Sequence, residues 1–290
     1  ISFTLNTERV YFKAKNGRWK KNIQTYEKEK IRSVSLFSGG LDSLIGVIDE
    51  LEKLGNDEKM LFVSHFDYKS SGPNGDQSKL YNYLKEKYID KIYWVQSKLA
   101  LNRKNENFEN VKLENNYRSR SLFFIGLGCY LSPTDKLIIP ENGTISINYP
   151  LTPSRVSSLS TRTTHPFVID NIQKLLNNCG LGVIIVNPYT FKTKGEMFIN
   201  CTNQNVLNGI YEKSVSCGKR GRKQHWTIKV GTEQCGKCMP CIYRRAALNK
   251  ANLDTQIYGN NVLTVNSLTN DLPALFSFLN RQISIEKMKR

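Results

Sequence analysis

The sequence has no long apolar run, no charged-then-apolar leader, no internal repeat and no low-complexity tract. A membrane-spanning helix needs about 18 or more consecutive apolar residues, so no membrane partner is expected. The chain starts at Ile1 without a secretory leader, which predicts a cytoplasmic protein. Because 39% of its 290 residues are apolar, a disordered chain is excluded. One large domain, or a core with a smaller module, is expected.

Acidic side chains are scarce relative to basic ones. The 25 Asp and Glu stand against 42 Lys and Arg, which gives a net charge of +17. This excess favours an anionic partner, such as a nucleotide, a nucleic acid or an acidic protein surface. A solvated basic surface explains the same charge equally well, so a nucleic-acid partner is possible but less favoured than a small nucleotide.

From Ile31 onward, apolar runs of strand length alternate with helix-like segments. Strands are expected at residues 31–37, 60–66, 91–96, 136–142 and 182–188. Helices are expected between them at residues 43–55, 76–89, 117–131 and 166–180. This alternation predicts an α/β fold whose parallel sheet is covered by helices on both faces. Residues 1–30 are expected to form a β-rich extension, with strands at 1–5 and 9–14 and a turn at 15–19.

The segment SGGLDS stands where the first core strand gives way to its helix. Ligands bind at the carboxyl end of a parallel strand, where the N-terminus of the following helix favours anions. The two glycines allow close approach of a phosphate, the two serines add hydroxyls, and Asp42 would need Mg²⁺ between itself and a phosphate. A serine-capped turn is the alternative, and both the Walker loop and the G-x-G-x-x-G pattern are absent. The residues expected at a bound phosphate are Ser38, Gly39, Gly40, Leu41, Asp42 and Ser43.

Seven cysteines, an odd number, argue against a disulfide scaffold. Four of them have the spacing Cys-x17-Cys-x2-Cys-x2-Cys and are Cys217, Cys235, Cys238 and Cys241. Four thiolates suit a closed, structural Zn²⁺ site. An iron–sulfur cluster is the alternative, and His225 could replace one ligand. The basic segment 218–226 between the ligands is interpreted as a solvated tip, with a nucleic-acid contact as the alternative.

Residues 141–165 show no regular pattern, and a stretch of this length inside a compact domain is usually functional or disordered. Its hydroxyls and prolines predict an ordered substrate-binding loop. Glu141 and Asn142 could accept hydrogen bonds from a substrate, and threonine hydroxyls could donate to phosphate oxygens. Forked hydrogen bonds from arginines could hold a carboxylate or phosphate. His165 precedes Pro166 and is expected to end an extended segment before a helix, with acid–base catalysis as the alternative. The other candidates are Arg118, Arg120, Arg155, Arg162, Thr161, Thr163 and Thr164.

Two motifs carry a resemblance to a known superfamily. SGGLDS resembles the pyrophosphate loop, or PP-loop, of the N-type ATP pyrophosphatases, which cleave ATP between the α- and β-phosphates. The segment TKGEM, at Thr193–Met197, is similar to their second, lysine-bearing motif. The resemblance implies that Lys194 neutralises phosphate charge in the transition state and that Phe66 lies near the adenine. A solvated lysine at the start of a helix is the alternative for Lys194.

Together with the cysteine spacing, the loop resembles the QueC family, the 7-cyano-7-deazaguanine synthases, over roughly residues 31–250. The matching residues are Ser38–Ser43, Lys194, Ser216, Cys217, Cys235–Cys241 and Arg244. The resemblance implies a Rossmann-like sheet of the adenine nucleotide alpha-hydrolase type, ATP and Mg²⁺ as cofactors, and a structural Zn²⁺. It also implies a ligase activity: activation of 7-carboxy-7-deazaguanine, amide formation with ammonia, and dehydration to the nitrile. Lys194, Asp42, Arg118 and Arg120 are then the catalytic candidates.

The long loop departs from typical QueC proteins and is similar to the QueC-like proteins of anti-phage operons, the Qat and type IV CBASS groups. This implies an antiviral role and a different acceptor, the N-terminal amine of a partner protein from the same operon. A tRNA-thiolating enzyme, with Cys129 or Cys201 as sulfur carrier, and a non-catalytic nucleotide sensor are the alternatives. The expected domains are an extension (1–30), a PP-loop core (31–210), a zinc module (211–250) and a C-terminal segment packing on the core (251–290).

Overall fold

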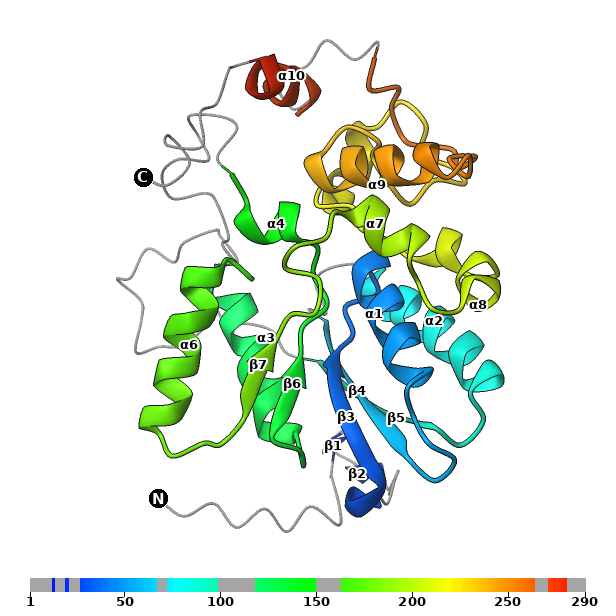
Figure 1. Cartoon of the computed structure of the whole chain (residues 1–290). Helices are drawn as coiled ribbons and strands as arrows, with labels where there is room; N and C mark the ends of the chain where they lie inside the picture. Colours follow the sequence, from blue (N-terminus) through cyan, green and yellow to red (C-terminus); the bar gives the residue numbers. More distant parts are fainter. Residues whose placement is uncertain are drawn as a thin grey trace.

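A five-stranded, all-parallel sheet forms the centre of the computed structural model (Figure 1). The structure describes residues 12–13, 19–20, 27–66, 72–98, 118–149, 163–263 and 271–280. The strands are β3 (Ile31–Leu36), β4 (Lys59–Phe66), β5 (Ile92–Lys98), β6 (Lys136–Ile138) and β7 (Ile184–Val186). Their order is β5-β4-β3-β6-β7, and every neighbouring pair is parallel. The predicted α/β fold with a parallel sheet is therefore confirmed.

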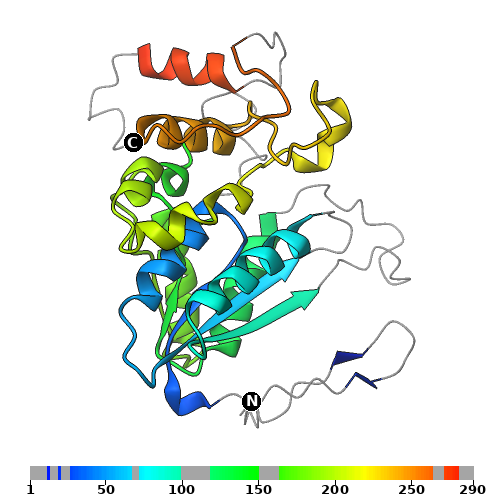
Figure 2. The ribbon, with the colours of Figure 1, turned by 90° about the vertical axis from the view of Figure 1, so that its right-hand side faces the viewer.

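Helices cover both faces of the sheet and lie on either side of the strands in Figure 1, whereas Figure 2 looks onto the face covered by α2. Helices α1 (Leu41–Leu51) and α2 (Pro73–Lys87) lie on one face, and α3 (Arg118–Leu131) and α6 (Pro166–Asn178) on the other. Successive residues of a strand point to opposite faces. In β4, Met60 therefore packs into the core under α1 and α2, and Leu61 into the core under α3 and α6.

Helix α1 is buried along almost its whole length, which explains its nearly continuous apolar sequence. The sheet covers one side, and α7 (Lys194–Ile199) and α8 (Gln204–Asn208) contribute Met197 and Leu207 to the same core. A Cβ atom on Gly46 would lie 2.3 Å from the Cβ of Pro140, so glycine is required there. This close contact brings the first half of α1 beside the chain that leaves β6.

The remaining elements lie outside the sheet. They are β1 (Phe12–Lys13), β2 (Trp19–Lys20), η1 (Lys28–Lys30), α4 (Gly143–Ile147), η3 (Tyr211–Lys213), η4 (Arg220–His225), α9 (Met239–Lys250) and α10 (Leu272–Asn280). Strands β1 and β2 pair antiparallel, so the expected β extension is present in part. Trp19 belongs to β2, not to the expected turn, and the strand expected at 1–5 lies outside the described residues.

Residues 141–165 were expected to lack regular structure, and this prediction is wrong for part of the segment. Helix α4 occupies residues 143–147, where an asparagine cap starts a turn too short to produce a periodic apolar pattern. Residues 150–162 lie outside the described part of the chain. None of the helices among the described residues is long and apolar enough to cross a membrane.

Candidate functional site

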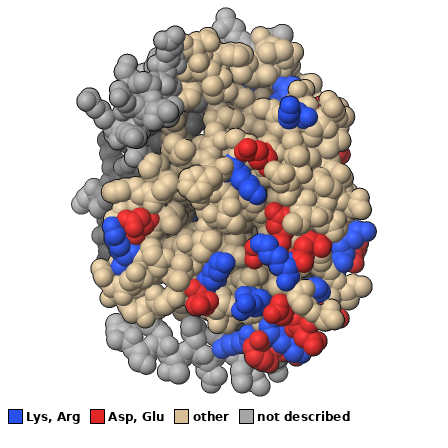
Figure 3. Space-filling view, in the orientation of Figure 1, with Lys and Arg blue, Asp and Glu red and all other residues tan. Residues whose placement is uncertain are grey.

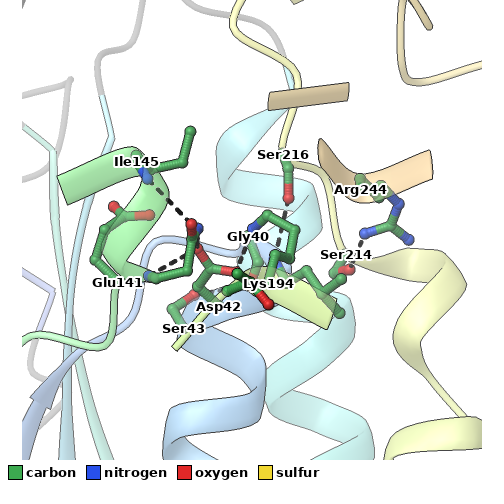
Figure 4. A network of polar contacts seen from close by, with 12 residues as sticks. Gly40, Asp42, Ser43, Glu141, Ile145, Lys194, Ser214, Ser216 and Arg244 are labelled. Carbon is green, nitrogen blue, oxygen red and sulfur yellow. Dashed lines mark hydrogen bonds and ion pairs between the residues drawn. The ribbon is translucent and has the colours of Figure 1, made fainter. Parts of the chain in front are cut away.

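The glycine loop, residues Ser38–Ser43, joins the central strand β3 to α1 (Figure 4). Gly39 has a φ of +87°, which favours glycine. The Ser38 hydroxyl accepts a hydrogen bond from the Gly40 N–H at 3.3 Å and donates to Ser43 Oγ at 3.1 Å. The Ser43 hydroxyl bonds the Gly40 carbonyl at 2.9 Å. The serines thus fold the loop into a compact turn at the N-terminus of α1.

The loop lies at the point where the strand order reverses. From β3 the chain continues to β4 on one side, and it later returns to β6 on the other side. The segments that follow β3 and β6 therefore diverge at the carboxyl edge of the sheet, which is where open α/β sheets bind ligands. Asp42 from α1, Asn142 ahead of α4 and Lys194 at the start of α7 meet there, although they lie up to 152 residues apart in sequence.

Asp42 and Lys194 form a buried ion pair at this point. Their relative exposures are 6% and 5%, so the alternative of a solvated lysine at the start of a helix is wrong. The Asn142 side-chain amide donates to Asp42 Oδ2 at 2.7 Å. Burial raises the pKa of Asp42, but the charge of Lys194 and the hydrogen bonds around the carboxylate outweigh it and leave this pKa below its ordinary value. The predicted motif at Thr193 does start a helix, through a capping box between Thr193 and Glu196.

Glu141 is the second carboxyl of the site. Its burial and the negative charge of Asp42 raise the pKa of Glu141 well above its ordinary value, although Lys194 opposes this. Glu141 therefore retains a proton to higher pH than an exposed glutamate does. A carboxyl that keeps its proton can donate a hydrogen bond as well as accept one, and the expected contact of Glu141 with a substrate stays a prediction.

This shift makes stability depend on pH. Above the ordinary carboxyl pKa of 4.5, the unfolded chain releases the proton of Glu141 while the folded chain retains it, so the free energy of unfolding falls as pH rises toward the raised pKa. Glu141→Gln is expected to flatten this part of the profile and to stabilise the chain at neutral pH. Urea unfolding at a series of pH values measures it, and parallel profiles for both proteins would contradict the assignment.

Asn142 was expected to bind substrate, but the structure uses both ends of its side chain internally. Its Oδ1 accepts from the Ile145 N–H at 3.0 Å as the N-cap of α4, while its Nδ2 holds Asp42, and the residue is 0% exposed. Asn142 is therefore a positioning residue for the Asp42 carboxylate, in place of the predicted substrate contact.

Asn142→Ala is expected to lower the free energy of unfolding by about 2–3 kcal/mol, because it removes a helix cap and a buried hydrogen bond to a carboxylate. Chemical denaturation measures the change. Asn177→Ala, at an exposed position on α6, is the matched control and is expected to change it by less than about 0.5 kcal/mol. Equal effects of the two substitutions would contradict the positioning role.

Thr163, Thr164 and His165 of the predicted substrate loop also have internal partners. Thr164 is buried and shares a hydrogen bond of 3.1 Å with Ser146 of α4. Thr163 accepts from Ser121 of α3 at 3.0 Å. His165 is the N-cap of α6 and accepts from the Phe167 N–H at 3.2 Å, which confirms its expected place at the start of a helix. These contacts join α3, α4 and α6. A hydroxyl can both donate and accept, so the expected substrate contacts stay predictions.

Of the other candidates, the structure describes the side chains of Phe66 and Arg120. Phe66 is the last residue of β4 and is half-buried at the carboxyl edge of the sheet. Arg120 is exposed in the first turn of α3. Arg155, Thr161, Arg162 and the side chain of Arg118 lie outside the described residues.

Sequence reasoning missed Gln77, which holds the carboxyl ends of two strands together. It is 1% exposed, and its Nε2 donates to the carbonyls of Ser38, at 3.2 Å, and His65, at 3.1 Å. Gln96 on β5 in turn donates to Gln77 Oε1 at 2.8 Å. A single glutamine on an amphipathic helix gives no sequence signal, because its role depends on how α2 lies against the sheet.

The four predicted metal ligands form a compact cluster. The sulfurs of Cys217, Cys235, Cys238 and Cys241 all lie within 4.8 Å of one another, and three of the four residues are buried. The Cys235 and Cys241 sulfurs are 3.8 Å apart, close to the edge of about 3.8 Å expected for a tetrahedron with Zn–S bonds of about 2.3 Å. Backbone N–H groups of Lys219, Cys235 and Cys238 point at the Cys217 and Cys235 sulfurs. The cluster can therefore hold one metal ion such as zinc, and His225 is not part of it.

The basic segment between the ligands is largely neutralised within the protein. Arg220 pairs with Asp76 and Glu233, Lys223 also pairs with Glu233, and Lys219 pairs with Asp271. Figure 3 shows basic and acidic side chains interspersed over the described part of one face. The expected solvated tip is therefore found only in part, because Arg222, Gln224 and His225 are exposed while the paired side chains are partly buried. The pairs leave less free positive charge for a nucleic-acid contact.

Fold and site thus define a parallel α/β protein with a glycine loop at the reversal of strand order and a four-cysteine cluster that could hold a metal ion. No protein-family model matches the chain, and no curated protein matches it.

Proposed function

We propose that the chain is an ATP-dependent ligase of the QueC-like, PP-loop type that activates the carboxylate of 7-carboxy-7-deazaguanine. The observation that supports this most is the Asp42–Lys194 ion pair beside the glycine loop. Lys194 is 5% exposed and stands at a helix start, where its ammonium group could exchange Asp42 for a phosphate as its anionic partner.

Each residue then has a defined part. The loop serines and N–H groups bind the departing pyrophosphate, and Lys194 stabilises the charge that develops during transfer. Asp42, released from Lys194, is the carboxylate that would hold Mg²⁺, which neutralises charge on the phosphates. A carboxylate oxygen of the substrate forms a bond to the α-phosphorus while the bond to pyrophosphate breaks. A nitrogen nucleophile then forms the amide C–N bond, loses a proton and displaces AMP.

The N-terminal amine of a partner protein is the proposed nucleophile, within an anti-phage system, and ammonia is the alternative. The two are separated by the mass of the product. A protein conjugate gains the mass of 7-carboxy-7-deazaguanine less one water, whereas ammonia leads to a free small molecule. Intact-mass analysis of co-expressed partner proteins, with and without this chain, distinguishes them.

The proposal competes with tRNA thiolation, which needs a reactive cysteine near ATP. The two candidates, Cys129 and Cys201, are both buried. Burial raises the pKa of Cys129 to about 11 and of Cys201 to about 12. Because reactive thiols are partly exposed and have lowered pKa values, this observation favours carboxylate activation.

Release of pyrophosphate and AMP from ATP tests the proposal. With 7-carboxy-7-deazaguanine alone, about one pyrophosphate per active site is expected, and with a nitrogen nucleophile also present, continued release of pyrophosphate and AMP in equal amounts. Tight ATP binding without pyrophosphate release would support a nucleotide-sensing subunit instead. Absence of both binding and release would refute the assignment of the loop to ATP.

A further inference from the structure

Residues 214–217, which we call the linker, run from the core to the four-cysteine cluster and touch the glycine loop on the way. The backbone N–H of Leu41, the first residue of α1, donates to Ser216 Oγ at 3.2 Å. The Val215 N–H donates to the Gly39 carbonyl at 3.0 Å. The next residue, Cys217, is a member of the cluster. The loop and the metal centre are thus joined through one short segment, which Figure 4 shows at Ser216.

Arg244 holds the first residue of the linker, Ser214, in place. This α9 side chain is 0% exposed, and it donates to Ser214 Oγ at 2.8 Å and to the Tyr211 carbonyl at 2.8 Å. Its Nε donates to Gln256 at 3.0 Å. Arg244 lies three residues after Cys241, so the position of the guanidinium depends on the same cluster.

A second path of hydrogen bonds connects Arg244 to Ser216 through two glutamines. Gln256 accepts from Gln234 at 3.2 Å, and Gln234 accepts from the Ser216 N–H at 3.4 Å. Gln234 precedes Cys235, another member of the cluster. Both ends of the linker are therefore fixed by residues whose neighbours in sequence are the metal-ligating thiols.

We infer that metal binding at the four-cysteine cluster orders the glycine loop, and that Ser216 is the positioning residue through which it acts. The first N–H groups of a helix have no acceptor within the helix, and Ser216 supplies one for Leu41. Among the described residues the Ser216 hydroxyl accepts this bond and donates none, so its proton remains for a ligand oxygen at the loop. Without the metal, Cys217 and Cys235 are no longer fixed relative to the other two cysteines. The linker then no longer holds the glycine loop in place.

Hydrogen–deuterium exchange of peptides covering residues 37–44 tests this inference without relying on activity. In zinc-loaded protein, Ser216→Ala is expected to speed exchange at the Leu41 amide by about 10-fold, and Ser216→Thr to restore it. Chelation of zinc is expected to produce the same change or a larger one, with α6 unaffected. Ser132→Ala, at the opposite end of the sheet, is the matched control. Wild-type exchange in Ser216→Ala would overturn the inference.

A second arm rests on the proposed function and measures ATP affinity by calorimetry. Ser216→Ala is expected to raise the Kd for ATP by about 10-fold, or about 1.4 kcal/mol, with zinc content unchanged and adenosine affinity unaltered. An equal loss of ATP and adenosine affinity would contradict a role at the loop. If wild-type protein binds no ATP, the proposed function fails, whereas the exchange measurement still decides the role of Ser216.

Discussion

Cys241→Ser is expected to abolish stoichiometric zinc binding and to lower the melting temperature by more than about 10 °C. Cys241 is fully buried in the cluster, so a hydroxyl there replaces a metal-ligating thiolate without access to water. Structural zinc sites contribute on the order of 10 kcal/mol to folding. A loss of about 4 kcal/mol already lowers the melting temperature by roughly 10 °C in a chain of this size. Elemental analysis and calorimetry measure the two effects.

Cys179→Ser is the matched control, because Cys179 is exposed and lies outside the cluster. It is expected to retain one zinc ion per chain and the wild-type melting temperature. Full zinc content in Cys241→Ser would show that the metal is held elsewhere. Iron in place of zinc in the purified protein would identify the alternative iron–sulfur centre.

Lys194→Met is expected to reduce substrate-dependent pyrophosphate release by about 10³-fold, because a positive charge next to the transferring phosphate is lost. The substitution also leaves Asp42 buried without its partner, which costs about 3–5 kcal/mol of stability. The double variant Asp42→Asn/Lys194→Met removes both charges and is expected to fold more stably than the single variant. Both variants are expected to lose activity in steady-state assays. Because the double variant is expected to fold more stably than the single variant, unfolding does not explain its loss of activity.

Lys192→Met is the control for general loss of positive charge. Lys192 is exposed and lies two residues before Lys194 on the same segment. Its replacement is expected to change activity by less than twofold. Near-wild-type activity of a folded Lys194→Met would exclude Lys194 from the transfer step.

The arrangement of the sheet could be predicted from sequence because burial on both faces requires continuous apolar strands. The runs before Phe37 and around Met60 show this pattern, and both are strands of the parallel sheet. The four-cysteine cluster could also be predicted, because a spacing of two residues brings three thiols within reach of one ion whatever the surrounding fold.

The contacts inside the site could not be predicted, because they join residues far apart in sequence. The amide of Asn142 reaches Asp42 across 100 residues, and the Leu41 N–H reaches Ser216 across 175. Asn142 looked available for a substrate because its contact with Asp42 depends on how α1 packs against the end of β6, and its contact with Ile145 on a helix of only five residues. Short elements such as α4 escaped detection for a related reason: one cap and five residues carry no periodicity.

The central claim is that a carboxylate is adenylylated at this site, and an oxygen label tests it most directly. 7-carboxy-7-deazaguanine carrying ¹⁸O in both carboxylate positions is incubated with ATP, Mg²⁺ and a nitrogen nucleophile, and the AMP is weighed by mass spectrometry. Attack of the carboxylate on the α-phosphorus transfers one labelled oxygen, so AMP is expected to be 2 Da heavier. Unlabelled AMP, or ADP in its place, would contradict the claim.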